Sequence, residues 1–321
     1  MFVLFLISVN YGSILTTAGV IHAQPYPNRP IHLVIPMPPG GFMDIIGRWL
    51  AEDLERILGT KVIVLNKTGA SMTLGTDSVV RSKKDGYTIL YTNTSAIVYA
   101  RVTNPEAVPY DPFKDLEPLG LNLFFPLAVA VHESSPWKSY VELVDYAKKN
   151  PQQIRVCTTG QGSIDHFNLE LTQTLTGAQF THVPLKGASQ IVTALTGGHV
   201  EATYTAFNVV TSYVDSGTMR ILLLSKKMPG FPQVPTLPEL GYKQDLLSAW
   251  FAWYAPAGVP EEVKRVLIPA IEKAIRNPEL KAKIEKIGCI VDYKPPAELK
   301  KLMVEDYERA SAIAAKIGLR K

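Results

Sequence analysis

A proline- and glycine-rich loop between an apolar run and a helical pattern constrains this chain most. Residues 31–35 are mostly β-branched or leucine, which predicts a strand, and the prolines in 36–39 end it because proline cannot donate to a sheet ladder. Gly40 and Gly41 follow, and apolar residues then recur at helical spacing over 45–54. Such a loop directs backbone N–H groups and the positive end of a helix dipole toward an anion. A tight turn without a ligand is the alternative interpretation.

Two more strand signals, at 61–65 and 87–91, follow with a helical pattern over 76–82 between them. This β-α-β-α-β order predicts a parallel sheet covered by helices. Ligands of such sheets bind at the carboxyl ends of the strands. Three loops rich in small or polar residues fall at that edge: Gly40–Asp44, Asn66–Ser71 and Thr92–Ser95.

The opening pattern recurs in the middle of the chain. Residues 154–158 form a predicted strand, 159–163 a second glycine loop and 164–175 a helix. Two long apolar runs, Leu119–Val131 and Ala249–Tyr254, suit strands that cross between lobes. The tail, 260–318, is expected to be helical. We therefore expect one lobe from 24–125 with 247–321, a second from 126–246, and a ligand cleft between them.

Composition narrows the class of protein. The chain is 46% hydrophobic and 19% charged, which is typical of a soluble globular protein. Its net charge of +4 is too small to indicate a nucleic-acid partner, and no Lys/Arg cluster is interleaved with aromatic residues. The two cysteines, Cys157 and Cys289, are expected to be free thiols, so the core rather than a disulfide framework carries stability.

Residues 1–23 contain no Lys, Arg, Asp or Glu and lead through small and apolar residues to Ala23. This pattern predicts a secretory signal peptide cleaved near Ala23. A retained membrane anchor is the alternative, but polar residues interrupt the apolar run before it reaches spanning length.

Signatures of catalysis are lacking in the sequence. There is no G-x-S-x-G elbow and no P-loop, and Asp165 stands where a dinucleotide fingerprint needs its third glycine. The six histidines show no metal-ligand spacing. We therefore expect no catalytic residues, no cofactor and no metal.

Ser163 and His166 would both lie on the first turn of the helix after the second glycine loop. A hydroxyl and an imidazole placed there can donate to a carboxylate at the helix start. The alternative is a capping serine with a core histidine. For Asp44 we expect a cap on its own helix. Its alternative role is to accept a hydrogen bond from an amine or hydroxyl of a ligand.

These residues resemble the Bug family, the substrate-binding proteins of tripartite tricarboxylate transporters. The similarity runs from about Tyr26 to the C-terminus, in order and with family-like spacing. It rests on these motifs: Tyr26-Pro-Asn-Arg-Pro30, the proline-glycine loop with Asp44, Asp85-Gly-Tyr-Thr88, Gly160-x-Gly-Ser163 with His166 and Glu170, Lys186-Gly187, Gly197-Gly198, Pro232-x-Val-Pro-Thr236, and Trp250 with Ala255-Pro-Ala-Gly258.

The resemblance implies a type II periplasmic binding-protein fold, with two doubly wound α/β lobes around a ligand cleft. It also implies that backbone amides of the two glycine loops hold a carboxylate of a small organic acid. The expected ligand-binding residues are Met37, Pro39, Gly40, Gly41, Phe42, Met43, Asp44, Thr94, Ser95, Gly160, Gly162, Ser163, His166, Lys186, Gly187 and Asn208.

The chain departs from the family pattern at Phe42-Met43, Ala70-Ser71-Met72, Leu185 and Phe207. Each change makes the cleft more apolar or less acidic than is usual in the family. Our hypothesis is a ligand with one carboxylate and an apolar or aromatic body.

The leading interpretation is a monomeric periplasmic solute-binding protein that performs no reaction and delivers an organic acid to membrane transporter subunits. A ligand receptor for a membrane sensor kinase is the first alternative. A periplasmic hydrolase or isomerase on the same lobes is the second, and Ser163 with His166 is its only support.

Overall fold

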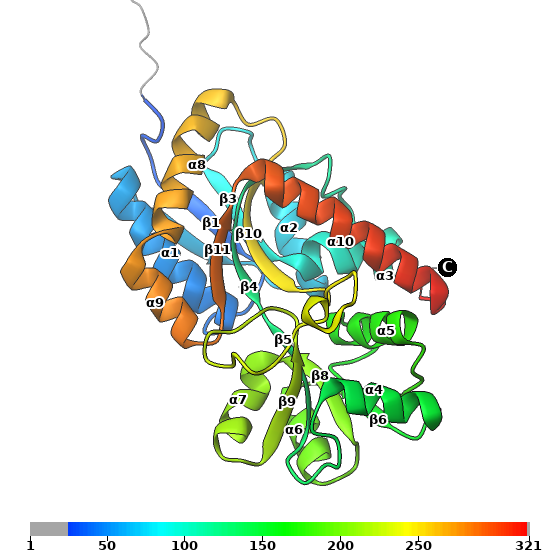
Figure 1. Ribbon diagram of the computed structural model, residues 1–321. Helices are drawn as coiled ribbons and strands as arrows, with labels where there is room; N and C mark the ends of the chain where they lie inside the picture. The colour runs from blue at the N-terminus through cyan, green and yellow to red at the C-terminus, as the bar shows by residue number, and fades with distance from the viewer. Residues whose placement is uncertain (1–24, 320–321) are drawn as a thin grey trace, which may run out of the picture.

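The computed structural model describes residues 25–319, so the expected signal segment 1–23 lies outside the described residues. Two α/β lobes lie one above the other in Figure 1, each with its own sheet. The first sheet has the strand order β11-β4-β10-β3-β1-β2. Its strands are β1 (Ile31–Ile35), β2 (Val62–Asn66), β3 (Thr88–Asn93), β4 (Leu116–Phe125), β10 (Ala249–Pro256) and β11 (Ile290–Lys294).

The second sheet has the order β7-β6-β8-β5-β9. Its strands are β5 (Leu127–His132), β6 (Arg155–Thr158), β7 (Thr181–Pro184), β8 (Ala202–Ala206) and β9 (Met219–Leu224). The helices around it are α4 (Tyr140–Lys149), α5 (Ile164–Thr176), α6 (Ala188–Thr196) and α7 (Phe207–Asp215). Those of the first lobe are α1 (Phe42–Leu58), α2 (Thr73–Val80), α3 (Ala100–Thr103), α8 (Glu261–Ile275), α9 (Pro278–Lys286) and α10 (Pro296–Lys316), with short turns η1 (Ala70–Met72), η2 (Ser95–Tyr99) and η3 (Pro105–Ala107).

The predicted β-α-β-α-β unit is confirmed. β1 pairs in parallel with β2 and with β3, and α1 begins directly after Gly41. α1 ends at Gly59, whose φ of 65° lies in the left-handed region that glycine tolerates. Residues 31–93 thus adopt the strands and helices that their local sequence predicts.

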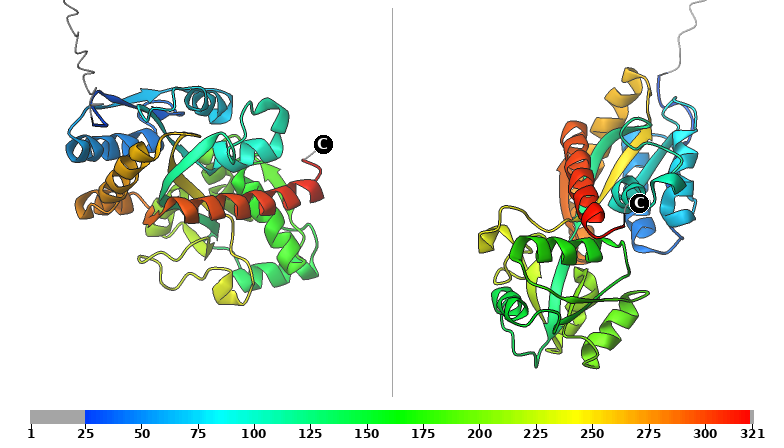
Figure 2. Two further views of the ribbon diagram at one scale, coloured as in Figure 1. Left: turned by 90° about the horizontal axis from the view of Figure 1, so that it is seen from above. Right: turned by 90° about the vertical axis from the view of Figure 1, so that its right-hand side faces the viewer.

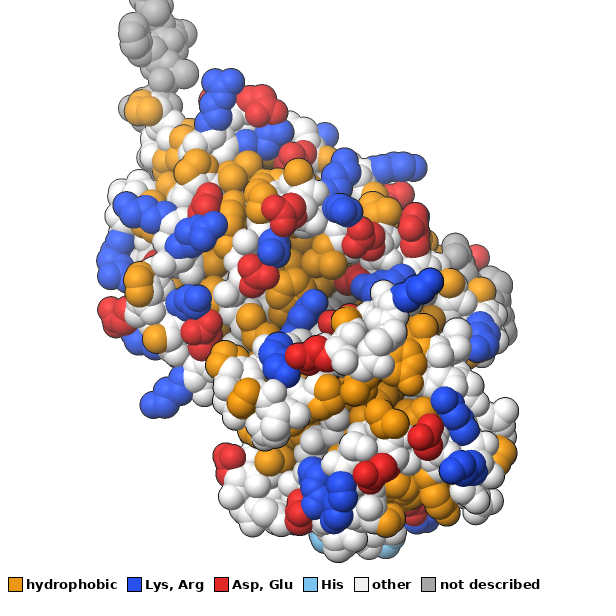
Figure 3. All heavy atoms as spheres, in the orientation of Figure 1, with side chains coloured by type: hydrophobic (Ala, Val, Ile, Leu, Met, Phe, Trp, Pro, Cys, Tyr) orange, Lys and Arg blue, Asp and Glu red, His pale blue; other side chains and the backbone are white. Residues whose placement is uncertain are grey.

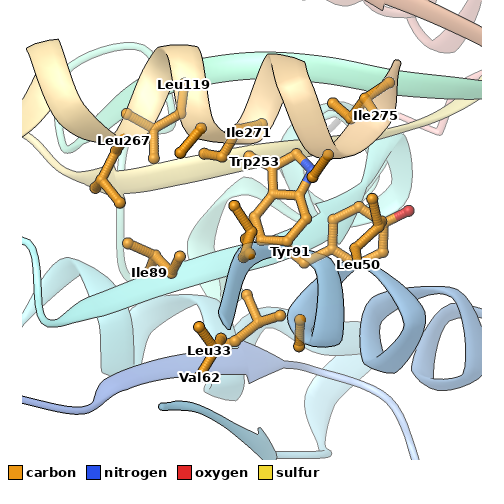
Figure 4. Close-up of a cluster of buried hydrophobic side chains, with 14 of the residues drawn as sticks. Leu33, Leu50, Val62, Ile89, Tyr91, Leu119, Trp253, Leu267, Ile271 and Ile275 are labelled. Atoms are coloured by element: carbon orange, nitrogen blue, oxygen red, sulfur yellow. The ribbon is translucent and has the colours of Figure 1, made fainter. Parts of the chain in front are cut away.

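One face of the first sheet is covered by α1 and α8. Figure 4 shows Leu267 and Ile271 of α8 pointing toward Trp253 of β10, with Leu50 of α1 beside Tyr91 of β3. All five side chains are fully buried. This packing fixes the sheet whose strand ends carry the first glycine loop.

The chain crosses between the lobes twice, as predicted. β4 of the first sheet runs through Pro126 into β5 of the second, and the segment after β9 returns to β10. The long apolar run 119–131 is therefore two strands in different sheets, and proline separates them because it cannot donate to a ladder. We propose these two connections as the lobe boundaries.

The prediction that the tail is wholly helical is wrong at one place. Residues Ile290–Lys294 form β11, which pairs antiparallel with β4 at the edge of the first sheet. The segment contains Val291 and Tyr293, which favour strands. Its short length hid the signal, and pairing with a distant strand decides its conformation.

Helix α5 of the second lobe packs against the first lobe. Phe167 and Leu171 on α5 lie in a cluster with first-lobe residues, and the Phe167 ring is 5.3 Å from that of Tyr99. The last turns of α10 add Lys316, whose Nζ donates to Thr174 on α5 at 2.8 Å. Figures 1 and 2 show the end of α10 beside α5. The lobes therefore share an apolar core on this side.

Charged side chains are mixed on the face shown in Figure 3, where neither sign forms a continuous patch. No helix within residues 25–319 combines the length and hydrophobicity needed to cross a bilayer. Cys157 and Cys289 are both free and buried, in agreement with the expectation from the sequence.

We predict that Phe167→Ala lowers the free energy of unfolding by about 3–5 kcal/mol, because it leaves a cavity in the core shared by the lobes. Val141→Ala on α4, where the side chain is 45% exposed, is the control and should change the value by less than about 0.5 kcal/mol. Urea unfolding measures both. A loss below about 1 kcal/mol for Phe167→Ala would mean that this packing is not tight.

Candidate ligand-binding cleft

Segments of both lobes line two shared cavities. The first has a volume of about 440 Å³ and lies between η1 and η2 of the first lobe and the Thr159–Ile164 segment of the second. Its lining residues are Ala70, Ser71, Thr73, Ser95, Tyr99, Ala100, Thr103, Asn104, Ala107, Val108, Thr159, Gly162, Ser163 and Ile164. None of these carries a charged side chain, so an anion there must be held by dipoles and hydroxyls.

The second cavity has a volume of about 860 Å³ and lies between α7 and the end of α9. Three aromatic side chains, Phe42, Phe207 and Phe231, contribute to its wall. Phe42 packs edge-on against Phe125 with ring centroids 4.8 Å apart, and it is only partly buried. The predicted residues Phe42 and Asn208 thus meet at this cavity, and Ser95, Gly162 and Ser163 meet at the first.

The first glycine loop is held by Asp44. Its Oδ2 accepts from the Gly40 N–H at 2.8 Å and from Arg48 Nε at 2.9 Å, and its Oδ1 accepts from Asn66 at 2.8 Å. Burial opposes ionisation, but the hydrogen bonds from Arg48, Gly40 and Asn66 lower the pKa of Asp44 overall. Asp44 therefore closes the loop from the first turn of α1. The expectation that it caps its own helix is wrong, because the N–H that it takes belongs to Gly40, outside the helix, and the N-cap of α1 is Gly41, without a side-chain hydrogen bond. The Gly40 N–H, expected to meet a ligand, is engaged within the loop.

The other first-loop residues take different places. Met43 is 3% exposed and lies in the core of the first lobe rather than on the cleft wall. The carbonyl of Met37 accepts from the Asn66 side chain at 3.0 Å. Pro39 is exposed, and Gly41 is partly buried; a β-carbon added at Gly41 would meet only the Pro38 carbonyl, at 3.4 Å.

The second glycine loop ends in a capped helix start. Ser163 Oγ accepts from the His166 N–H at 3.2 Å and donates to the Gly160 carbonyl at 2.8 Å. Gly160 and Gly162 have φ of 127° and 76°, which side chains rarely adopt. The first N–H groups of a helix have no acceptor within it, and Ile164, the first residue of α5, lines the first cavity.

The side chain of His166 holds the second glycine loop through a hydrogen bond. Its Nδ1 accepts from the Gly162 N–H at 3.1 Å, and its ring stacks on His182 with centroids 4.1 Å apart. His166 is 6% exposed and its Nε2 lies 3.7 Å from Glu170. Because the Ser163 hydroxyl donates to a carbonyl, Ser163 and His166 are not arranged as nucleophile and base.

Of the remaining predicted residues, Asn208 lines the second cavity, and Thr94, Lys186 and Gly187 line neither. Thr94 is buried, and its Oγ1 accepts from the Trp250 N–H at 2.8 Å, which fastens β3 to β10. Lys186 is exposed and its N–H donates to Gln190 at 2.8 Å. Gly187 precedes α6 with φ 151°. Asn208 is exposed on the first turn of α7.

The structure adds η1, which the list of expected site residues lacks. Ala70, Ser71 and Met72 all have left-handed backbones, with φ of 44°, 51° and 76°. Left-handed backbone costs roughly 1–2 kcal/mol per residue. Hydroxyls of Thr73 and Thr76 hold it by donating to the Ala70 and Met72 carbonyls at 2.7 and 3.0 Å. Non-glycine residues give no sequence signal for this geometry.

Metal binding finds no support in the described part of the chain. Within residues 25–319 no group of three or more His, Cys, Asp or Glu side chains is arranged to hold an ion. The first cavity offers backbone N–H groups, hydroxyls and apolar surface to a ligand, whereas the lining of the second also includes Asp215, Lys227, Glu285 and Lys286.

The histidines behind the second loop make stability depend on pH. Burial, reinforced by neighbouring His166, lowers the pKa of His182 from its ordinary 6.5 to about 4. The folded protein then binds fewer protons than the unfolded chain between these values. The stability that neutral His182 contributes is thus complete above about pH 6.5 and is lost as the pH falls through about 4. Asp165, whose pKa burial raises to about 6, acts in the opposite sense.

We predict that His182→Gln makes the free energy of unfolding fall less between pH 6.5 and pH 4 than it does in the natural chain. Asp165 is present in both proteins, so its contribution cancels in the comparison. Exposed His199→Gln is the control and should keep the natural pH profile. Denaturant unfolding at several pH values measures the profiles, and equal slopes for all three proteins would contradict the assignment.

Comparisons with known proteins agree with this architecture. Residues 46–319 match the family described as "Tripartite tricarboxylate transporter family receptor". Protein BugT of Bordetella pertussis is 31% identical over 312 residues, which cover 96% of each chain. A TctC solute-binding protein from Polaromonas, solved without ligand, superimposes with a TM-score of 0.83 at 28% identity, over 91% of this chain and 99% of that one.

A second solved structure, R. palustris Rpa4515 with adipate, superimposes with a TM-score of 0.73 at 26% identity. The match covers 91% of this chain and 98% of the Rpa4515 chain. The family match spans most of the chain, and the two-lobed fold agrees with it. The chain is therefore a member of the tripartite tricarboxylate transporter receptor family, a family of solute-binding proteins.

Proposed function

We propose that this chain is the periplasmic solute-binding subunit of a tripartite tricarboxylate-type transporter and captures a small organic acid with one carboxylate. The observation that supports this proposal most is the first cavity, where the start of α5 and the second glycine loop meet a first-lobe wall of uncharged polar and apolar residues. A ligand held there contacts both lobes and stabilises their closed arrangement.

The start of α5 is the proposed carboxylate site. The N–H groups of Ile164 and Asp165, which have no acceptor among the described residues, and the helix dipole both favour a negative charge at this position. The cavity lining contains no Lys or Arg, so these N–H groups supply the charge-assisted hydrogen bonds that a buried carboxylate needs. Gly162 and Ser163 place the ligand close to the backbone.

The rest of the ligand is proposed to be apolar or aromatic. Ala100, Val108 and Ile164 line the first cavity, and Phe42 with Phe207 lines the second. The related protein Rpa4515 is described with adipate, a dicarboxylate whose body is aliphatic, so it supports the apolar body and not the number of carboxylates. Family membership supports delivery to membrane transporter subunits, and a sensor kinase is the alternative partner.

Titration calorimetry with a panel of organic acids tests the proposal. We expect binding of acids that carry a carboxylate and an apolar body, and weak or no binding of amino acids and citrate-like tricarboxylates, whose extra charges find no partner in the cavity. Binding confined to amino acids or tricarboxylates would contradict it.

A matched pair of glycines at the two ends of α5 tests the site. We predict that Gly162→Ala and Gly177→Ala each cost about 1 kcal/mol of stability, because φ is 76° and 77°. Only Gly162→Ala should weaken acid binding, by at least about tenfold, since its new methyl group would lie 3.2 Å from Thr103 of the first lobe. At Gly177 nothing lies within 4 Å. If the two variants bind the acid with equal affinity, the second glycine loop is not part of the binding site.

A further inference from the structure

Some hydroxyl groups in the first cavity form hydrogen bonds within the protein, and others have no partner in the described part of the chain and could bind a ligand. Seven lining residues carry a hydroxyl: Ser71, Thr73, Ser95, Tyr99, Thr103, Thr159 and Ser163. Four of them donate within the protein, to the Ala70, Tyr99 and Gly160 carbonyls and to the Asp165 carboxylate. The Tyr99 hydroxyl is enclosed within the protein and has no partner among the described residues.

Ser71 and Ser95 remain. Neither side chain forms a hydrogen bond with another residue in the range 25–319, and both line the first-lobe wall of the cavity. Ser71 belongs to η1 and Ser95 begins η2, and these two turns lie next to each other. The second-lobe wall holds the proposed carboxylate site, so the serine pair stands on the other wall.

The backbone holds Ser71 in place before any ligand arrives. The left-handed turn is fixed by the hydroxyls of Thr73 and Thr76, and Met72 anchors it against the first-lobe core. A hydroxyl on such a rigid turn loses little freedom on binding, which favours affinity. Left-handed backbone at non-glycine residues is a form of strain that collects at binding sites.

The chemistry of this wall suits a neutral group. No Lys or Arg lines the cavity to compensate a second carboxylate. The N–H of Ser95, at the start of η2, is already bonded to Asn93 Oδ1 at 3.0 Å. At the start of α5, by contrast, the N–H groups of Ile164 and Asp165 have no acceptor among the described residues. A serine hydroxyl both donates and accepts, so it pairs with a hydroxyl or a carbonyl without a charge.

We propose that Ser71 and Ser95 determine specificity by binding a neutral hydroxyl or carbonyl at the end of the ligand opposite its carboxylate. The ligand class is then an acid with one carboxylate, an apolar body and a neutral polar end. This inference rests on the proposed function, because it places the carboxylate at α5.

Three acids with the same six-carbon chain test the inference: hexanoate, 6-hydroxyhexanoate and adipate. Calorimetry should show 6-hydroxyhexanoate binding about fivefold to tenfold more tightly than hexanoate, the gain from one additional hydrogen bond. Adipate should bind more weakly than 6-hydroxyhexanoate. Ser71→Ala should reduce 6-hydroxyhexanoate to the level of hexanoate and leave hexanoate unchanged, and Ser95→Ala should act in the same direction.

Ser134→Ala, at an exposed turn of the second lobe, is the control and should bind all three acids as the natural chain does. Ser71→Gly removes the hydroxyl together with the backbone strain, so it remains informative if Ser71→Ala folds poorly. Adipate as the tightest ligand, or an equal loss for hexanoate and 6-hydroxyhexanoate in Ser71→Ala, would overturn the inference alone. Failure of all three acids to bind would overturn both it and the proposed function.

Discussion

The packing of α5 against the first lobe is the interaction on which the rest of the structure depends. Phe167 and Leu171 are buried among first-lobe side chains, although α5 is a helix of the second lobe. This contact holds the start of α5, with Gly162 and Ser163, opposite η1 and η2. A cavity with walls from both lobes exists because this helix is fixed at their junction.

Several residues that look suited to a ligand serve the loops instead. Asp44 takes the Gly40 N–H, and His166 takes the Gly162 N–H. Each acceptor fixes the conformation of a glycine loop that would otherwise be free to move. The first cavity is thereby left with backbone dipoles and small side chains. This suits the proposed capture and release of an acid, because no strong ion pair would have to be broken.

The fold was largely predictable because its signals are local. A strand, a glycine loop and an amphipathic helix occur once in each half, and the proline at 126 separates two strands of one apolar run. β11 was missed because pairing with β4, over 160 residues away in the chain, decides its conformation. The site was harder to predict. Met43 looks like a loop residue in sequence but packs into the core, and the left-handed backbone of Ser71 has no sequence signal.

Mass spectrometry of the small molecule released from protein purified without refolding tests the central claim most directly. The account predicts an organic acid with one carboxylate, an apolar body and no amino group. It also predicts that Gly162→Ala, purified in the same way, carries less of that acid than Gly177→Ala does. Recovery of an amino acid, a tricarboxylate or a cationic solute as the bound molecule would contradict the account.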